Sequence, residues 1–430
     1  MPDRPDQAPV RSAARRVAVI GGGVAGLTAG YLLRTRCDVT LFEARSRLGG
    51  HAHTHQVAGP DGAVYAIDTG FIVCNTRTYP LLTRLLRELG VATQRTEMSL
   101  SVRCDGCGLE YAGGRGIPGL AAGRSAADRR YLRMLAEAPR FYRAARGALT
   151  CAPDPAEQTL GQFLSAFGFS VYFQQHFAAP LVSTVWSCPP RLAFSYPARY
   201  LFTFLANHGL LSVRRQVTWH TISGGSANYV NRIAGALARV RVGCAVRSVR
   251  RLGSGVEVRD QSGATAVFDA AVIATHADQA LSMLASPTRL ERAVLGAFGY
   301  SSNRVLLHGD PRLLPRSRGA RASWNYYQDS CAGTGPVRVC YDLNRLQRLG
   351  TPHRYLVSVN PGTEPKASTV AAAMTYDHPV YTPKSVGAQR RLAELNDGCL
   401  AFAGAYHGWG FHEDGCRSGV AAAVSLGATW

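Results

Sequence analysis

Residues 17–26 read VAVIGGGVAG and residues 39–50 read VTLFEARSRLGG. The first stretch predicts an apolar strand that runs through the glycine pattern Gly21-x-Gly23-x-x-Gly26 into a helix, and the second predicts another apolar strand that ends at Glu43. Glycines in such a turn let the backbone approach a pyrophosphate, which the helix N-terminus stabilises. The carboxylate of Glu43 follows Gly26 by 17 residues, where it can bond an adenosine ribose. This order of elements predicts a dinucleotide-binding unit and a redox enzyme.

Composition narrows the class of protein. The chain has 430 residues, of which 46% are hydrophobic, so it is long enough for two domains with real cores. Its formal net charge of +20 comes almost entirely from arginine, since lysine occurs only at Lys366 and Lys384. A solvated arginine-rich surface explains this charge best. An anionic membrane or substrate is the alternative, and we expect no nucleic-acid partner because no recognition motif accompanies the charge.

The cysteines and the apolar runs predict the cellular compartment of the protein. Eleven cysteines with scattered spacings indicate reduced thiols and a cytoplasmic protein. The apolar run at 17–33 is interrupted by glycines, so any membrane contact should be peripheral, on the inner face of the membrane. The sequence carries no prediction of oligomeric state.

These residues resemble the superfamily of FAD-dependent amine oxidases and phytoene desaturases, which includes the protoporphyrinogen oxidases. The resemblance lies in residues 17–70, in Val246 with residues 270–275, and in residues 402–419. A bacterial branch of predicted NAD/FAD-binding oxidoreductases is similar nearly end to end, through DTGF at 68–71, WSCPP at 186–190 and FHEDG at 411–415. The resemblance implies an FAD-dependent oxidoreductase. We expect non-covalent FAD, because no recognisable attachment motif is present.

The same resemblance implies which residues contact FAD. The implied cofactor-binding positions are Gly21, Gly23, Gly26, Glu43, Arg45, Gly49, Gly50, His51, Gly70, Phe71, Val246, Gly404, Phe411, Glu413 and Gly415. The first three would approach the pyrophosphate, Glu43 and Arg45 the adenosine, and Val246 the adenine. Residues 49–51 would line the pyrophosphate and ribityl path, and residues 70–71 the flavin ring. The last four would close over the ribityl chain and flavin carbonyl, at the start of a final helix.

Departures from the family pattern favour a particular substrate class. His51 stands where many relatives carry arginine, neither lysine falls in a flavin-facing block, and Phe411 occupies a position of the tyrosine cage of amine oxidases. We therefore expect dehydrogenation or desaturation of a hydrophobic substrate, a lipid acyl chain or a secondary-metabolite intermediate, by hydride transfer to flavin. An amine or amide C–N oxidase and a redox-neutral flavin isomerase or mutase remain alternatives. His412, Tyr406 and His51 are the candidate catalytic bases, and each is equally a candidate for orienting the flavin.

The predicted fold is α/β, with a Rossmann-like FAD-binding domain and an inserted α+β substrate domain that contains an antiparallel sheet. We assign residues 16–90, 216–295 and 396–430 to the FAD-binding domain and residues 91–215 and 296–395 to the substrate domain, after a disordered lead at 1–15. Alternating apolar and polar residues at 302–360 predict the sheet. An arginine-rich pattern at 124–146 predicts an exposed helix, with a membrane-facing helix as the alternative.

Three weaker patterns are open to a structural explanation. His51, His53 and His55 alternate as metal ligands on a strand would, and Cys104-x-x-Cys107 has the spacing of half a zinc site. No second CxxC is present and Asp105-Gly106 suits a hairpin turn, so we expect no metal. Twelve aromatic residues between positions 163 and 204 predict a packed core in which some members line an apolar tunnel.

Overall fold

A five-stranded parallel sheet joins the two ends of the chain. The computed structural model describes residues 14–122, 126–150, 158–211 and 217–430. Along the sheet the strands are β19 (Leu400–Phe402), β13 (Ala270–Ile273), β1 (Arg15–Ile20), β2 (Cys37–Phe42) and β9 (Arg239–Arg241). The predicted disordered lead at 1–15 includes Arg15, but Arg15 is the first residue of β1. Residues 1–13 lie outside the described part of the chain.

Both faces of this sheet are buried, as a continuous apolar strand requires. Val17 and Val19 pack on the side of α1 (Val24–Leu33) and α15 (His412–Ser425). Ala18 and Ile20 join a second cluster on the opposite side, which contains residues of a three-stranded sheet. That sheet consists of β10 (Val246–Leu252), β11 (Gly255–Asp260) and β12 (Thr265–Phe268). The helices on this side are α11 (Ala277–Met283), α12 (Arg289–Leu295) and α14 (Pro383–Gln389).

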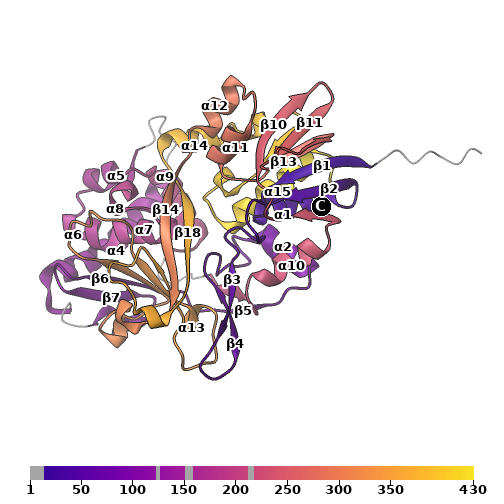
Figure 1. The fold of residues 1–430 in the computed structure, drawn as a ribbon. Helices are drawn as coiled ribbons and strands as arrows, with labels where there is room; N and C mark the ends of the chain where they lie inside the picture. Colours follow the sequence, from indigo (N-terminus) through magenta and orange to yellow (C-terminus); the bar gives the residue numbers. More distant parts are fainter. Residues whose placement is uncertain (1–13, 123–125, 151–157, 212–216) are drawn as a thin grey trace, which may run out of the picture.

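A seven-stranded sheet forms the floor of the second half of the molecule. Its strands in order are β18 (Val370–Val380), β14 (Gly299–His308), β17 (Leu356–Val359), β16 (Val339–Asp342), β15 (Trp324–Gln328), β6 (Leu100–Cys104) and β7 (Leu109–Gly113). All neighbours are antiparallel except β15 and β6, so the predicted antiparallel sheet is confirmed with one parallel pair. The β14–β18 pair extends from this sheet toward the parallel sheet (Figure 1).

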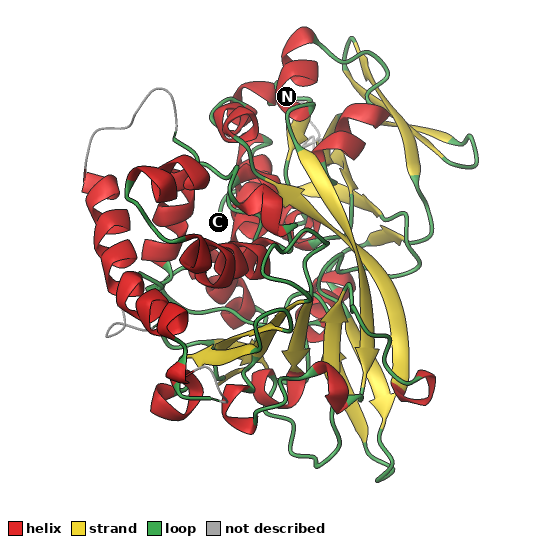
Figure 2. Cartoon of the chain, turned by 90° about the vertical axis from the view of Figure 1, so that its left-hand side faces the viewer, coloured by secondary structure: helices red, strands yellow, loops and turns green. Residues whose placement is uncertain are grey.

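A group of helices covers this floor and supplies most of its core. Figure 2 shows these helices on the left and the long strands on the right. The group comprises α4 (Arg129–Thr150), α5 (Leu160–Ala166), α6 (Val171–Phe173), the π-helix η2 (Gln174–Ala178), α7 (Ala179–Trp186), α8 (Pro190–Ala193) and α9 (Ala198–Asn207). The arginine-rich helix begins at Arg129, later than predicted, and Arg124 lies outside the described residues.

The remaining α-helices and strand pairs of the described chain are short. They are α2 (Pro80–Glu88), α3 (Gly116–Leu120), α10 (Ala227–Gly235), α13 (Leu343–Leu346) and the strand pairs β3 (Thr54–Ala58) with β4 (Val64–Asp68) and β5 (Thr93–Arg95) with β8 (His220–Ile222). Within the described ranges, none of the helices combines the length and the apolar character that crossing a bilayer requires.

Candidate functional site

The turn after β1 is built so that backbone can approach a ligand. Gly21 has φ of +107°, and its N–H donates to Phe42 O at 2.8 Å. A Cβ on Gly26 would lie 1.9 Å from Gly21 O, so α1 packs on the turn more closely than any side chain allows. A Cβ on Gly23 would meet no atom of the described residues within 4 Å, because this residue faces a cavity. Val24 and Ala25 line the same cavity, so the N-terminus of α1 is available to an anion.

A second glycine loop lies against the first. Gly49 and Gly50 have φ of +102° and +58°, and a Cβ on Gly50 would lie 3.1 Å from Gly23 Cα. A Cβ on Gly70 would lie 2.1 Å from the carbonyl oxygen of His51. These close approaches let Gly50, His51 and Gly70 share one wall of the cavity.

Glu43 marks the far end of this wall. Its carboxylate accepts hydrogen bonds from the N–H of Gly22 at 2.7 Å and of Arg45 at 2.8 Å. Glu43, Arg45 and Val246 all line the cavity, next to the turn at the end of β1. The three residues predicted to hold adenosine therefore lie together at one end of the site.

The cavity runs between the two halves of the molecule and has a volume of about 1380 Å³. It joins the glycine loops to the C-terminal residues Gly404, Tyr406, Phe411 and His412 and to the helical group. Pockets for a single ligand usually measure about 300–1,000 Å³. There is consequently room for a dinucleotide and for a substrate beside it.

Most predicted cofactor residues meet in this cavity, and four do not line it. The lining residues are Gly21, Gly23, Glu43, Arg45, Gly50, His51, Gly70, Phe71, Val246, Gly404 and Phe411. Gly26 and Gly49 permit the two loops to form, and Gly415 lets α15 approach α1, since its Cβ would lie 2.6 Å from Val24 Cγ1. The carboxylate of Glu413 points elsewhere: it accepts the N–H groups of Leu81 and Leu82 at 3.1 and 2.9 Å and so caps α2.

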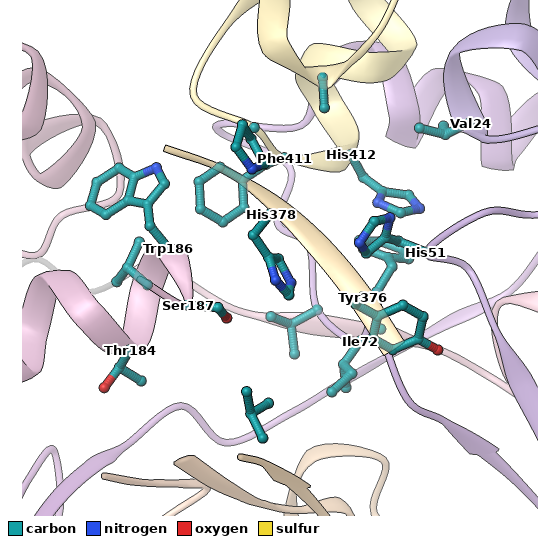
Figure 3. Close-up of a pocket in the computed structure, with 18 of the residues that line it drawn as sticks. Val24, His51, Ile72, Thr184, Trp186, Ser187, Tyr376, His378, Phe411 and His412 are labelled. Carbon is teal, nitrogen blue, oxygen red and sulfur yellow. The ribbon is translucent and has the colours of Figure 1, made fainter. Parts of the chain in front are cut away.

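A group of neutral histidines occupies the middle of the cavity. The ring of His51 lies 5.4 Å from that of His378, 6.4 Å from that of His276 and 5.0 Å from that of Tyr376. Figure 3 shows His378 between His51 and Trp186. Burial lowers the pKa of His51 well below 6.5 and that of His378 to about 4. Both imidazoles are therefore uncharged at neutral pH.

The three candidate bases differ in what their polar atoms contact. His51 Nε2 is buried without a hydrogen-bond partner among the described residues. His412 is stacked on Phe71 with ring centroids 3.8 Å apart, and its Nε2 lies 3.2 Å from Tyr229 Oη. The Tyr406 hydroxyl is also unpartnered in the described chain, and burial raises its pKa well above 10. Of the three, His51 is the one whose basic nitrogen has no partner among the described residues, while the neutral Tyr406 hydroxyl is no base at neutral pH.

Sequence reasoning missed His378. Asn303 donates from Nδ2 to His378 Nδ1 at 3.0 Å, and the Asn303 side chain is held in turn by the Ser187 and Ser301 carbonyls. The neutral ring therefore carries its proton on Nε2. No local motif marks this position, because the pairing of β14 with β18 brings the two side chains together.

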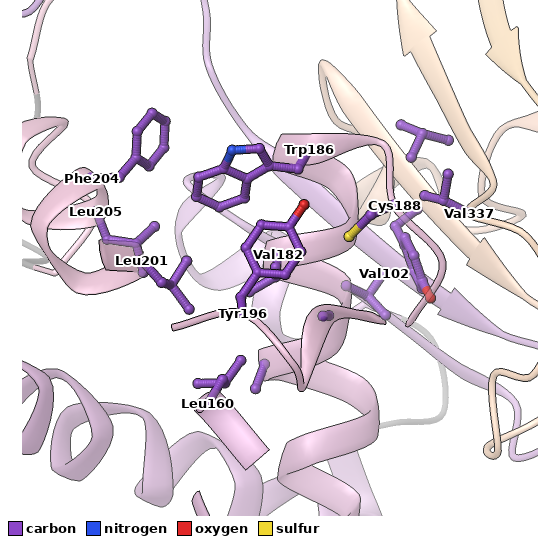
Figure 4. Close-up of a cluster of buried hydrophobic side chains, with 14 of the residues drawn as sticks. Val102, Leu160, Val182, Trp186, Cys188, Tyr196, Leu201, Phe204, Leu205 and Val337 are labelled. Atoms are coloured by element: carbon purple, nitrogen blue, oxygen red, sulfur yellow. The ribbon is translucent and has the colours of Figure 1, made fainter. Parts of the chain in front are cut away.

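Beyond His378 the cavity extends into an apolar arm, which is lined by Trp186, Phe204 and Phe411. Trp186 and Phe204 have ring centroids 4.7 Å apart, and Phe204 stacks on Phe411 at 4.9 Å. Trp186 Nε1 donates to the carbonyl oxygen of Trp409 at 2.9 Å. Of the twelve aromatic residues at 163–204, Phe177, Trp186 and Phe204 line the cavity. The other aromatic residues of this set, except the half-exposed Phe167, belong to the hydrophobic core. Figure 4 shows one of them, Tyr196, next to Trp186.

Comparison with known proteins identifies the family. The family model of flavin-containing amine oxidoreductases matches residues 24–358. The chain belongs to this family. The glycine loops, the cavity-facing N-terminus of α1 and the acid at the end of β2 fit FAD, the flavin cofactor that membership of this family implies.

Named relatives are consistent with this membership. The putative flavin-containing monoamine oxidase AofH of Mycobacterium tuberculosis is 31% identical over 259 residues, which cover 57% of this chain and 54% of that protein. The chain thus spans about half the length of this curated relative.

Solved structures share the fold at low sequence identity. Cyclohexylamine oxidase from Brevibacterium oxydans matches with a TM-score of 0.68 at 17% identity, over 96% of this chain and 99% of that one. A CLA-producing fatty acid isomerase from P. acnes matches with a TM-score of 0.63 at 16% identity, over 95% and 97% of the two chains. These likenesses confirm the mixed α/β fold predicted from the sequence.

Proposed function

We propose that this oxidoreductase dehydrogenates an apolar substrate, such as a lipid acyl chain or a similarly apolar secondary-metabolite intermediate. The observation that carries the proposal is the apolar arm of the cavity around Trp186, Phe204 and Phe411. Bound FAD supplies the acceptor for a hydride that leaves carbon. The chain must then hold the substrate carbon, exclude water and take up one proton.

The charges that line the cavity disfavour a cationic substrate, since four arginines and three carboxylates line it. Among the described lining residues the carboxylates are Glu43, Glu97 and Asp377, and no lysine lines the wall. Glu43 is occupied by backbone N–H groups, and Glu97 pairs with Arg345 at 3.1 Å and Arg115 at 3.2 Å. An ammonium group would therefore find few available carboxylates in this cavity.

The neutral histidines suit proton uptake beside an apolar chain. His51 presents inside the cavity an Nε2 without a partner among the described side chains, and its lowered pKa keeps this nitrogen unprotonated at neutral pH. His378 carries its proton on Nε2 and donates rather than accepts. We assign proton uptake to His51 and substrate positioning to His378.

Two other functions remain as alternatives. Amine oxidation is the activity in the names of AofH and of cyclohexylamine oxidase, and Asp377 is the lining carboxylate that an ammonium group could use. A redox-neutral isomerase is the second alternative, since the solved fatty acid isomerase has a similar fold.

Anaerobic reduction of the FAD-loaded protein tests these functions against one another. We expect the visible flavin band to bleach on addition of fatty-acyl lipids and to be unchanged by mono- and diamines. Bleaching by amines alone would refute the proposal in favour of C–N oxidation, and Asp377→Asn should then abolish it. Conversion of a lipid without any electron acceptor would identify an isomerase.

A matched pair of variants in α4 tests the apolar arm. Leu135 lines the cavity, whereas Leu132 on the same helix is 50% exposed and does not. Leu135→Arg should slow lipid-dependent bleaching by about ten-fold or more, because it buries a charge in the arm. Leu132→Arg should leave the rate unchanged. Equal rates in both variants would show that the substrate does not occupy this arm.

We also propose that the substrate is taken from a membrane surface. Leu120 at the end of α3 lines the cavity and is 38% exposed, and Ile117 in the same helix is 80% exposed. The exposed arginines of α4 follow next in the chain, although Arg130 and Arg133 are paired with Asp128 and Glu137. Co-sedimentation with anionic phospholipid vesicles should be lost in Ile117→Asp. Equal sedimentation of both proteins would refute the contact.

A further inference from the structure

Three separate parts of the chain bring together four side chains that can bind a metal ion. Cys104 and Cys107 come from the β6–β7 hairpin, His176 from the π-helix η2, and Cys331 from the loop after β15. Their Sγ atoms and a ring nitrogen of His176 all lie within 4.8 Å of one another. We infer that these residues form a structural zinc site of the Cys₃His type.

The spacing of the ligand atoms fits a single tetrahedral ion. Cys104 Sγ lies 3.9 Å from Cys331 Sγ, and Cys107 Sγ lies 3.5 Å from His176 Nε2. With zinc bonds of ~2.3 Å to sulfur and ~2.0–2.1 Å to nitrogen, tetrahedral angles place two sulfurs ~3.8 Å apart and a sulfur and a nitrogen ~3.6 Å apart. Only small movements are needed for all four atoms to contact one ion.

The surroundings orient these ligands. His176 Nδ1 lies 3.0 Å from the carbonyl oxygen of Tyr172, so the ring donates there and leaves Nε2 unprotonated toward the thiols. The thiolate is the form of cysteine that binds zinc.

Glycines let the two loops meet. A Cβ on Gly106 would lie 2.9 Å from Ser330 Cα and 3.2 Å from the backbone nitrogen of Cys331. Gly108 has φ of +71°, which turns the chain back into β7. The hairpin predicted from Asp105-Gly106 is confirmed, and the expectation that the chain holds no metal is replaced by this proposal.

The proposed ion has a structural role. Four protein ligands fill a tetrahedral zinc, so no position is left for a substrate or a water. The ion would tie the β6–β7 edge of the sheet to η2, which continues directly into α7 and its cavity residues Thr184 and Trp186. Binding releases three thiol protons to solvent and involves no oxidation.

Metal content of the intact FAD-loaded protein is the first test. Protein produced with zinc in the medium and dialysed should contain about one zinc per chain by plasma mass spectrometry. Under denaturing conditions all 11 cysteines should react as thiols, with zinc released in parallel. A zinc-free protein would overturn the proposal. A thiol count two short of 11 would overturn it in favour of a Cys104–Cys331 disulfide.

Variants separate this site from adventitious binding. Cys331→Ser and His176→Ala should each lose most of the zinc, while Cys399→Ser, which changes a cysteine outside the cluster, should keep it. Undiminished zinc in both cluster variants would refute the assignment. If either variant fails to fold, cobalt substitution of the wild-type protein replaces it. Tetrahedral thiolate coordination should then produce ligand-field absorption at longer wavelength than the flavin band, and octahedral cobalt would contradict the site.

Discussion

Three glycines of one short segment should respond to alanine in three different ways. A Cβ on Gly26 would lie 1.9 Å from Gly21 O, about 1.5 Å short of the 3.4 Å at which ordinary contact begins. Gly26→Ala must therefore displace α1 from β1, at a cost of about 1–3 kcal/mol or more. A Cβ on Gly23 meets no atom within 4 Å in the described part of the chain, and the residue has φ of −76° and ψ of 179°, so Gly23→Ala should leave the apoprotein stable.

The added methyl group of Gly23→Ala instead occupies the space that a pyrophosphate needs. We expect FAD to bind at least about ten-fold more weakly, which is ~1.4 kcal/mol. Gly30 is the internal control: its Cβ would make ordinary contact with Leu237 Cδ1 at 3.5 Å. Gly30→Ala should stabilise the helix by about 0.5–1 kcal/mol and leave FAD affinity unchanged.

The assays are denaturant unfolding of the three apoproteins and fluorescence titration of each with FAD. The order of apoprotein stability should be Gly30→Ala above Gly23→Ala above Gly26→Ala. Wild-type FAD affinity in Gly23→Ala, or unfolding of its apoprotein at much lower denaturant, would refute the placement of the pyrophosphate at this turn.

Three further changes have defined outcomes. Burial lowers the pKa of His378 to about 4 and of His412 to about 3, so the unfolded chain takes up more protons below pH 6.5. Stability should therefore fall between pH 7 and pH 5, by about 2 kcal/mol per histidine in denaturant titrations. Glu413→Ala leaves two N–H groups of α2 without an acceptor and should cost about 1–3 kcal/mol, whereas the partly exposed Glu88→Ala should cost less than about 1. Phe411→Tyr adds a hydroxyl among aromatic rings and should slow flavin reduction by lipid without creating amine oxidation; faster reduction by amines would refute this.

The parts of the site that lie close together in sequence were predictable. The turn at Gly21–Gly26 and the acid at Glu43 belong to one β-α-β unit. Its turn needs glycine at fixed positions, so the spacing of the glycines identifies it from the sequence alone. The apolar alternation at 302–360 likewise predicted its sheet, because side chains alternate between faces. Local pattern placed the helix at 124–146 approximately, but its start at Arg129 was not apparent.

The parts that depend on distant pairing were not predictable. His378 meets His51 because β18 crosses the cavity, and nothing near either residue indicates this. Glu413 shows a second limit: only the fold reveals that the side chain at this position of the cofactor motif caps α2. The spacing of the hairpin cysteines is visible in the sequence, but His176 and Cys331 lie far along the chain and only the fold brings them to the hairpin.

The strand order of the parallel sheet has a consequence for synthesis of the chain. Val17 of β1 pairs with Ala270 of β13, and Ala271 pairs in turn with Leu400 of β19. A ribosome therefore delivers the first strand long before two of the strands that complete its sheet, and during this interval apolar edges are exposed. Nascent chains should need chaperone protection, and premature termination before α15 should yield no yellow protein. Flavin retention thus reports that α15 has been made.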